Sequence, residues 1–197
     1  MPKKKPSPSP PVRKPRADAE RNRERILEVA REVFTRDGAT ASLDDIARRS
    51  GIGNATLYRH FPTRDDLIEA VYSSEVEKLA TAEQLFAATM PPLEALRAWM
   101  FLFIDHVDSK RLILPAMDTV AGGSMRLIEG SRARIHSTFA AAVERAIASG
   151  DLRPETNPND FIRTLVGIFH TTALPGWKES ARRIVDILLA GSRSTSA

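Results

Sequence analysis

The chain has 197 residues, of which 42% are hydrophobic and none is cysteine. This composition supports a buried core and excludes a disordered chain, a disulfide framework and a thiolate metal site. The net charge of +4 is unevenly spread, because residues 1–64 carry 15 Lys and Arg against 8 Asp and Glu, whereas residues 65–197 carry 14 against 17. A basic N-terminal part suggests contact with a polyanion such as nucleic acid, although such a segment can also serve only solubility.

Residues 1–16 contain six prolines, six basic residues and no acid. Proline removes backbone donors and fixes φ, so we expect a disordered, extended arm that either lies along DNA or is an idle solvated tail. No apolar core follows the basic residues, so the arm is not a secretory signal peptide. The longest apolar run, Trp99 to Ile104, is too short to span a bilayer. We therefore expect a soluble, cytoplasmic protein.

From Ala17 to Ala190 the apolar residues recur at helical spacing, and no alternating run of strand length occurs. Glycine and proline interrupt this pattern at Gly38, Gly51–Gly53, Pro62, Pro91–Pro92, Pro115, Gly122–Gly123, Gly150–Pro154, Pro158 and Pro175–Gly176. The interruptions delimit about nine segments, and the sequence therefore predicts an all-α fold.

The segments near residues 42–51 and 54–61 are short and are joined by Gly51-Ile52-Gly53. Ser42, with Asp45 three residues later, is typical of a capped helix start. The second segment turns Leu57 and Phe61 inward and presents a polar set outward, and no acid occurs between Gly51 and Arg64. The outward set, which suits phosphate oxygens and base edges, is Asn54, Thr56, Tyr58, Arg59 and His60. This spacing also occurs in small helical bundles, so the residue types carry the helix-turn-helix interpretation.

The run from Leu43 to Leu67, with its Thr-Leu-Tyr-x-His-Phe core, resembles the TetR family of repressors, and the upstream Val33-Phe34-x-x-x-Gly38 matches too. The resemblance covers about residues 18–70. It implies a three-helix helix-turn-helix DNA-binding head and a C-terminal helical bundle that binds a ligand and dimerises. We accordingly expect an arm at 1–16, the DNA-binding domain at 17–64, the effector-binding and dimerisation domain at 65–190, and a disordered tail at 191–197.

The resemblance also implies roles for individual residues. Positions matching family phosphate contacts are Ser42, Thr56, Tyr58, His60 and Arg64, and those facing base edges are Gly53, Asn54, Ala55 and Arg59. Asn54 suits adenine, and Arg59 suits either guanine or a phosphate. The family often has Ser where this chain has Gly53, which leaves base reading there in doubt. Tyr58 can instead pack over the first helix, and His60 can instead cap a helix end.

Residues 93–107 are apolar on almost every side, as in a buried helix. The resemblance implies a pocket for a small apolar or amphipathic effector, for which the candidate lining is Trp99, Phe103, His106, Met117, Met125, His136, Phe139, Phe169 and His170. The alternative is that these residues are ordinary core. His106, His136 and His170 lack metal-ligand spacing, so we expect no metal, and we expect no cofactor.

The last two predicted helices, about Asn159–Thr172 and Gly176–Ala190, are amphipathic. The resemblance implies that they pair with a second copy into a four-helix homodimer interface, for which the candidates are Phe161, Leu165, Gly167, Ile168, Trp177, Ile184, Ile187 and Leu188. The alternative is that they only complete the monomer core.

The predicted function is therefore a transcriptional regulator that binds a palindromic operator as a dimer and is released by an effector. The resemblance implies that this regulator is a repressor. A DNA-binding regulator without a ligand, constitutive or controlled by a protein partner, is the second interpretation. An enzyme is a third, suggested only by Asp105 beside His106. The sequence lacks a paired-carboxylate cleft, a phosphate-binding loop and a nucleophile motif, so we predict no enzymatic activity.

Overall fold

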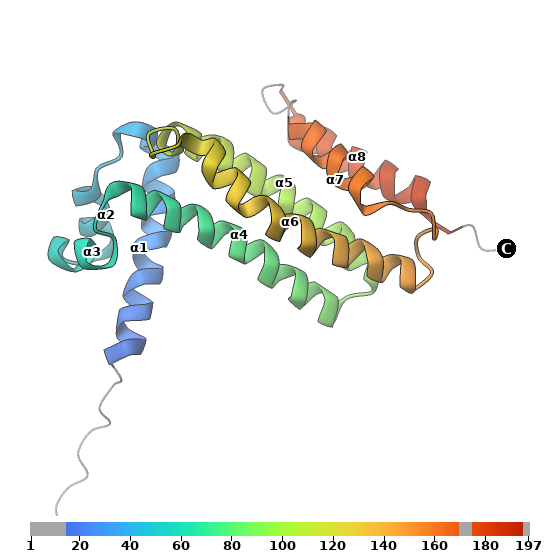
Figure 1. Cartoon of the computed structure of the whole chain (residues 1–197), viewed down its shortest axis with the longest axis horizontal. Coiled ribbons are helices and arrows are strands. Elements are labelled where there is room, and N and C mark those ends of the chain that lie inside the picture. The colour runs from blue at the N-terminus through green and yellow to red at the C-terminus, as the bar shows by residue number, and fades with distance from the viewer. Residues whose placement is uncertain (1–14, 170–174, 195–197) are drawn as a thin grey trace, which may run out of the picture.

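The computed structural model describes residues 15–169 and 175–194, and within these ranges the regular structure is helical (Figure 1). The elements in chain order are α1 (Pro15–Asp37), the 3-10 turn η1 (Gly38–Thr40), α2 (Leu43–Ser50), α3 (Asn54–His60), α4 (Arg64–Thr89), α5 (Pro92–Met117), α6 (Gly123–Ala148), α7 (Pro158–Phe169) and α8 (Trp177–Ser192). Extended pairing in these ranges is limited to an isolated bridge between Leu152 and Arg193. The all-α prediction is confirmed.

The helices form a small head and an elongated body (Figure 1). α1, α2 and α3 make the head, and α4 leads from it into the body, where α4, α5 and α6 run side by side. α7 and α8 lie together along the far side of α5. None of the helices in the described ranges combines the length and apolarity needed to cross a membrane.

Local sequence accounts for most helix ends. α4 begins with a capping box, in which the Thr63 hydroxyl accepts from the Asp66 backbone N–H at 3.1 Å and the Asp66 carboxylate accepts from the Thr63 N–H at 2.9 Å. α2 ends at Gly51, whose φ of +66° is the left-handed conformation that glycine adopts without strain. α1 begins at Pro15, two residues before the predicted start of the DNA-binding domain at residue 17.

The predicted interruption at Pro115 was wrong, because this residue lies inside α5. Proline in a helix interior loses a hydrogen bond and costs about 3 kcal/mol. Pro115 is in the last turn of α5, and its Cβ lies 3.3 Å from where a Cβ on Gly38 would be. Ile113, Ala116 and Met117 around it are buried, and their packing offsets the lost bond. The helix therefore continues for ten residues beyond the predicted segment 93–107.

Two hydrophobic cores form, which we call the head core and the body core. The head core joins α1, α2, α3 and the first half of α4 around Ile26, Phe34 and Leu57. It also contains five residues from beyond α4, namely Ile113, Ala116, Met117, Val120 and Leu127. The end of α5 and the start of α6 are therefore part of the head's packing, so the body cannot move there without disturbing the head.

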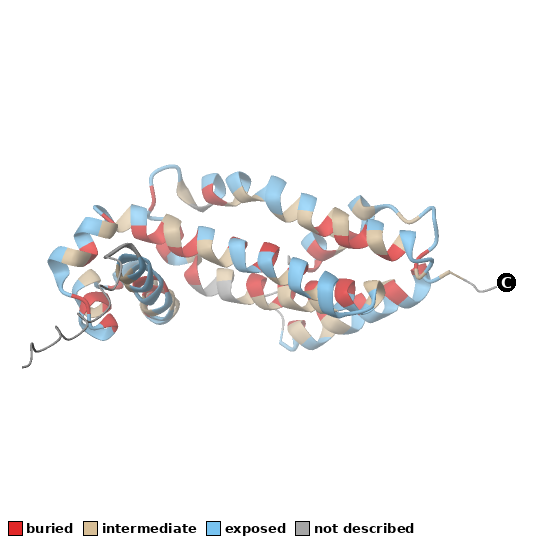
Figure 2. Ribbon diagram, turned by 90° about the horizontal axis from the view of Figure 1, so that it is seen from below, coloured by how far each residue is buried: buried red, intermediate tan, exposed pale blue. Residues whose placement is uncertain are grey.

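The body core lies among α5, α6, α7 and α8, with Leu79 from α4. At its centre Trp99 stacks on Phe103 with ring centroids 5.6 Å apart and meets Phe139 at 5.2 Å. The indole N–H of Trp99 donates to the Leu79 carbonyl at 3.0 Å, which satisfies the buried polar atom of this side chain. Figure 2 shows buried residues on the faces that the helices turn toward each other and exposed residues on the outer faces.

The shared head core leads to a stability prediction. Met117 is fully buried among head residues, whereas Met125 is 59% exposed. We expect Met117→Ala to lower the free energy of unfolding by about 2–4 kcal/mol and Met125→Ala by about 0.5 kcal/mol or less, since only the first leaves a cavity. Urea denaturation of both variants measures the difference, and equal effects would show that the end of α5 does not support the head.

Candidate nucleic-acid interface

The turn between α2 and α3 is tight and internally bonded. The Ser42 hydroxyl caps α2 by accepting from the Asp45 N–H at 3.4 Å. After Gly51, the Ile52 N–H donates to the Ala47 carbonyl at 3.1 Å, and the Ile52 side chain is buried in the head core. The turn thus sets the direction of α3, as the Gly-Ile-Gly sequence predicts.

Gly53 is the N-cap of α3, and its carbonyl accepts from the N–H groups of Thr56 at 2.8 Å and Leu57 at 3.1 Å. No side chain caps this end. Leu57 is 1% and Phe61 2% exposed. Their burial anchors the inner side of α3, and the opposite side must therefore face solvent.

The outer side of α3 carries most of the predicted DNA contacts. Asn54, Ala55, Tyr58 and Arg59 are exposed. The Tyr58 ring is 46% exposed, which favours a contact role over packing on α1. Thr56 and His60, at the edges of this face, are half-buried.

Arg59 donates from Nη2 to the Thr56 hydroxyl at 3.1 Å, and a guanidinium has four further N–H donors that can meet an anion or a base. The His60 ring is tilted against Phe61, with centroids 6.2 Å apart. The first turn of α3 contains no acid. The face therefore presents hydroxyl, amide and guanidinium donors, which suit contact with a polyanion.

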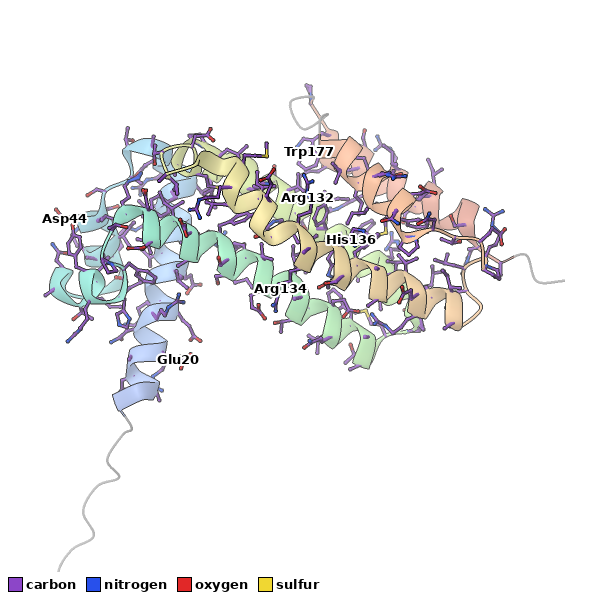
Figure 3. All side chains as sticks on the ribbon, viewed as in Figure 1. Glu20, Asp44, Arg132, Arg134, His136 and Trp177 are labelled. Carbon is purple, nitrogen blue, oxygen red and sulfur yellow. The ribbon has the colours of Figure 1, made fainter. Side chains whose placement is uncertain are left out.

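Asn54 is held from α2. Its Nδ2 donates to Asp44 Oδ1 at 2.8 Å. Sequence reasoning did not find Asp44 as part of this face, because its position is set by how α2 packs against α3 and not by any local pattern. Figure 3 shows Asp44 on the outer side of α2, at the end of the head remote from the body.

Arg64, a predicted phosphate contact, is occupied inside the protein. Its Nη2 donates to the carbonyls of Gly38 at 3.2 Å and Ala39 at 2.9 Å. Its guanidinium also lies over the Phe34 ring, 5.3 Å from the centroid. Arg64 thus ties the start of α4 to η1, and a phosphate contact by its remaining N–H groups stays a prediction.

Ion pairs link α1 to α2 in the head. Arg36 bonds Asp37 at 2.5 Å and Asp45 at 3.1 Å, and Arg49 bonds Glu32 at 2.9 Å. Hydrogen bonds from Arg36 hold the pKa of both Asp37 and Asp45 below the usual value. The Asp45 carboxylate is turned toward Arg36 and Arg48, so it does not complete the capping box suggested by the sequence.

Comparison with known proteins identifies this arrangement. Residues 26–71 match the family model described as bacterial regulatory proteins, tetR family, and residues 91–194 match the C-terminal domain of SbtR-like transcriptional regulators. The chain belongs to the TetR family.

Several relatives of this TetR protein are similar to it over most of its length. The HTH-type transcriptional regulator SrpR of Pseudomonas putida is 28% identical over 169 residues, which are 80% of this chain and 74% of that protein. The crystal structure of the TetR regulator SCO0520 from Streptomyces coelicolor is 39% identical, with a TM-score of 0.78 over 88% of this chain and 99% of that one. A TetR regulatory protein from Mycobacterium vanbaalenii is 28% identical, with a TM-score of 0.74 over 90% of this chain and 98% of that one.

The match is shorter in other relatives. The HTH-type transcriptional regulator SAUSA300_2515 of Staphylococcus aureus is 40% identical over 67 residues, and the chain spans only 36% of that protein. These relatives are named as transcriptional regulators. The family is one of DNA-binding regulators, which decides against the enzyme interpretation. Asp105, the residue behind that interpretation, is engaged by Arg182 at 3.2 Å and Lys178 at 2.9 Å in this TetR chain.

The structure distributes the predicted effector-pocket residues over three environments. Trp99, Phe103 and Phe139 pack together in the body core, and His106 lies in the neighbouring layer. Met117 belongs to the head core, Met125 is exposed, and His136 Nε2 bonds Asn159 Oδ1 at 2.7 Å. His170 and the Phe169 side chain lie outside the described residues. The structure therefore brings four of the nine candidates together.

His106 also belongs to a polar group between α4 and α5, which it forms with Tyr72 and Lys110. The His106 ring is 6.3 Å from the Tyr72 ring and 6.1 Å from the Phe103 ring, centroid to centroid. The Lys110 ammonium lies 5.9 Å from the Tyr72 centroid. Sequence reasoning named His106 but missed Tyr72 and Lys110, which only the pairing of α4 with α5 brings near it.

Burial governs the ionisation of this group. It lowers the pKa of His106 to about 4, with a smaller contribution from the Lys110 charge. Burial, aided by the charge of Arg132, lowers the pKa of Lys110 to about 8, and burial raises the pKa of Tyr72. His106 is thus neutral at physiological pH and can donate or accept one hydrogen bond at each ring nitrogen.

The predicted dimer residues divide between the core and the surface. Phe161, Leu165, Ile168 and Trp177 are buried in the body core, and Leu188 is half-buried against it. Ile184 is 40% and Ile187 70% exposed, and Gly167 is exposed with no atom within 4 Å of a Cβ placed on it. Val166, 51% exposed, joins this outer surface.

Across the ranges that the structure describes, no three His, Cys, Asp or Glu side chains gather closely enough to hold a metal ion.

The low pKa of His106 predicts a stability change in mild acid. A histidine in the unfolded chain has a pKa near 6.5, whereas His106 in the folded chain has a pKa of about 4. Between these pH values the unfolded chain therefore binds a proton at His106 that the folded chain does not bind. Stability from this residue is therefore present above pH 6.5 and is lost as pH falls toward 4. We expect a loss of about 2 kcal/mol between pH 7 and 4.5.

Urea denaturation across this pH range, with wild type, His106→Phe and His106→Asn, isolates that contribution from other titrating groups. Both variants lack a titrating ring and should lose less stability than wild type. If the free energy of unfolding changed with pH in the same way in all three proteins, the low pKa assigned to His106 would be contradicted.

Proposed function

We propose that this TetR-family protein is a repressor that binds a near-palindromic operator as a homodimer and is released by a small apolar or amphipathic effector. The observation that carries the DNA-binding mode is the outer face of α3, where Asn54, Tyr58 and Arg59 project from a helix anchored by two buried residues. A DNA-binding protein of this kind acts in the compartment that holds the chromosome, which for a bacterial regulator is the cytoplasm.

The proposed docking places α3 in the major groove. Ser42, Thr56, Tyr58 and His60 then contact phosphates, and Asn54 and Arg59 meet base edges. Gly53 and Ala55 have little side chain and allow close approach of the helix start to the bases. The hydrogen bond between Arg59 and Thr56 supports a joint role at the edge of the face.

Dimerisation is supported by the apolar surface of α7 and α8. Val166, Ile184 and Ile187 remain exposed although the monomer core is complete without them. Burying this surface against a second copy removes it from water, and Gly167 leaves room for a close helix approach. Two heads would then reach successive major grooves about one helical turn apart.

The effector is proposed to bind beside the Tyr72, His106 and Lys110 group. A neutral, buried imidazole beside aromatic rings offers one polar handle in an apolar setting, which suits an amphipathic molecule. About two turns later α5 enters the head core at Ile113 and Met117, so a shift of α5 reaches the head directly. Release requires that the effector bind the two α5 positions with different affinity.

The ligand-free alternative is favoured by one observation. Trp99, Phe103 and Phe139 fill the middle of the body with ring-to-ring contacts. A panel of small amphipathic molecules tested for release of operator DNA separates the two. If none of these molecules released the protein from operator DNA and a cellular protein did, the ligand-free alternative would be supported.

Selection of bound sites from random duplex DNA tests the operator proposal, and two variants test the face. Tyr58→Ala should weaken binding to all sequences by about tenfold, because it removes a phosphate contact. Asn54→Ala should instead relax base preference at one position of each half-site. Retention of full operator affinity and preference by both variants would show that another surface binds DNA.

Ile187→Glu tests the dimer. Ile187 is not part of the monomer core, so the fold should survive while the dimer dissociates, and operator affinity should fall on the order of a hundredfold as the two heads bind separately. Analytical ultracentrifugation and DNA titration measure both effects. Leu85→Glu, at a 58% exposed site on α4, is the matched control and should change neither.

A further inference from the structure

Asp44 is an unusual residue for a surface that meets DNA. A carboxylate repels the phosphate backbone, and the other acids around α2 are neutralised, Asp45 and Asp37 by Arg36 and Glu32 by Arg49. Among the residues that the structure describes, no basic side chain forms an ion pair with Asp44, and its partner is the Asn54 amide at 2.8 Å. An uncompensated negative charge is therefore held next to a proposed base-reading residue.

The chemistry of this contact restricts how Asn54 is turned. An ionised carboxylate only accepts hydrogen bonds, so the amide must point its NH₂ group toward Asp44. One N–H is used in that bond. The edge of the planar amide that remains available carries the Oδ1 acceptor and the second N–H donor.

Such an edge distinguishes adenine from guanine. Adenine offers the N6 donor and the N7 acceptor in the major groove, whereas guanine offers two acceptors, O6 and N7. A held amide pairs with adenine through both atoms, but places its oxygen against the guanine O6. An amide free to rotate can turn its NH₂ group toward guanine and loses that distinction.

We propose that Asp44 is a positioning residue that fixes the orientation of the Asn54 amide and makes α3 prefer adenine over guanine at the base that Asn54 meets. The inference rests on the proposed function, since it requires α3 in the major groove. Asp44 thus lowers general affinity for DNA and raises discrimination between the two purines.

A purely structural role would have other consequences. Asp44 lies in the first turn of α2, where a negative charge favours the helix dipole. Loss of that effect changes the stability of the head and leaves the ratio of affinities for adenine and guanine duplexes unchanged. The affinity ratio, and not stability, is therefore the decisive measurement.

The experiment uses the full-length protein and operator duplexes that differ only at the base where Asn54→Ala abolishes preference. Asp44→Asn is nearly isosteric, but an amide both donates and accepts, so it permits either orientation of Asn54. We expect Asp44→Asn to raise affinity for non-operator DNA about threefold, through the lost repulsion, and to lower the adenine-to-guanine affinity ratio of the two operator duplexes on the order of tenfold. Asp44→Glu, which keeps an acceptor-only group, should retain more of the ratio than Asp44→Asn.

Two controls separate charge from orientation. Glu20→Gln removes one exposed carboxylate from α1, away from Asp44 (Figure 3), and should leave the ratio unchanged. In an Asn54→Ala background, Asp44→Asn should have no effect on the ratio, because no amide remains to orient.

The outcomes distinguish this inference from the proposal beneath it. An enriched motif whose adenine-to-guanine ratio is the same in wild type and Asp44→Asn would overturn the role of Asp44 alone. If the wild-type protein enriched no motif, both the operator proposal and this inference would be overturned.

Discussion

The burial of Leu57 and Phe61 is the interaction on which the outer face of α3, the proposed DNA-binding face, depends. α3 has seven residues, which is too short for a helix to be stable alone in water. It persists because these two side chains are inserted into the head core and because the Gly51 turn and the Thr63 cap fix its two ends. With the inner side anchored, the polar residues have no alternative to facing outward.

The same core also links the head to the body. Ile113 and Met117 of α5 are packed among residues of α1 and α4, and Pro115 lies against Gly38 at the end of α1. Because packed cores change between discrete arrangements rather than deforming smoothly, a displaced α5 requires a different head position. α5 therefore contacts the head directly through α1 and η1, in addition to the covalent path through α4.

The helix-turn-helix was predictable because its signals are local. A glycine turn, a helix cap and two apolar positions on one side of α3 lie within about twenty residues, and each restricts the backbone or the burial of its neighbours. The body was predicted less well. Pro115 was expected to end a helix, and Met117 and Met125 were grouped with Trp99, although one lies in the head core and the other is exposed. Apolar character alone does not say which core a residue joins.

Sequence by itself determined the all-α class, the family and the outward residues of α3, because helical periodicity and turn chemistry act over a few neighbouring residues. Only the tertiary structure decided which contacts cross between helices. These include the bond from Asn54 to Asp44, the engagement of Arg64 by η1, and the meeting of His106 with Tyr72. Such contacts depend on helix crossing and rotation, which arise from the packing of the whole chain and leave no local pattern.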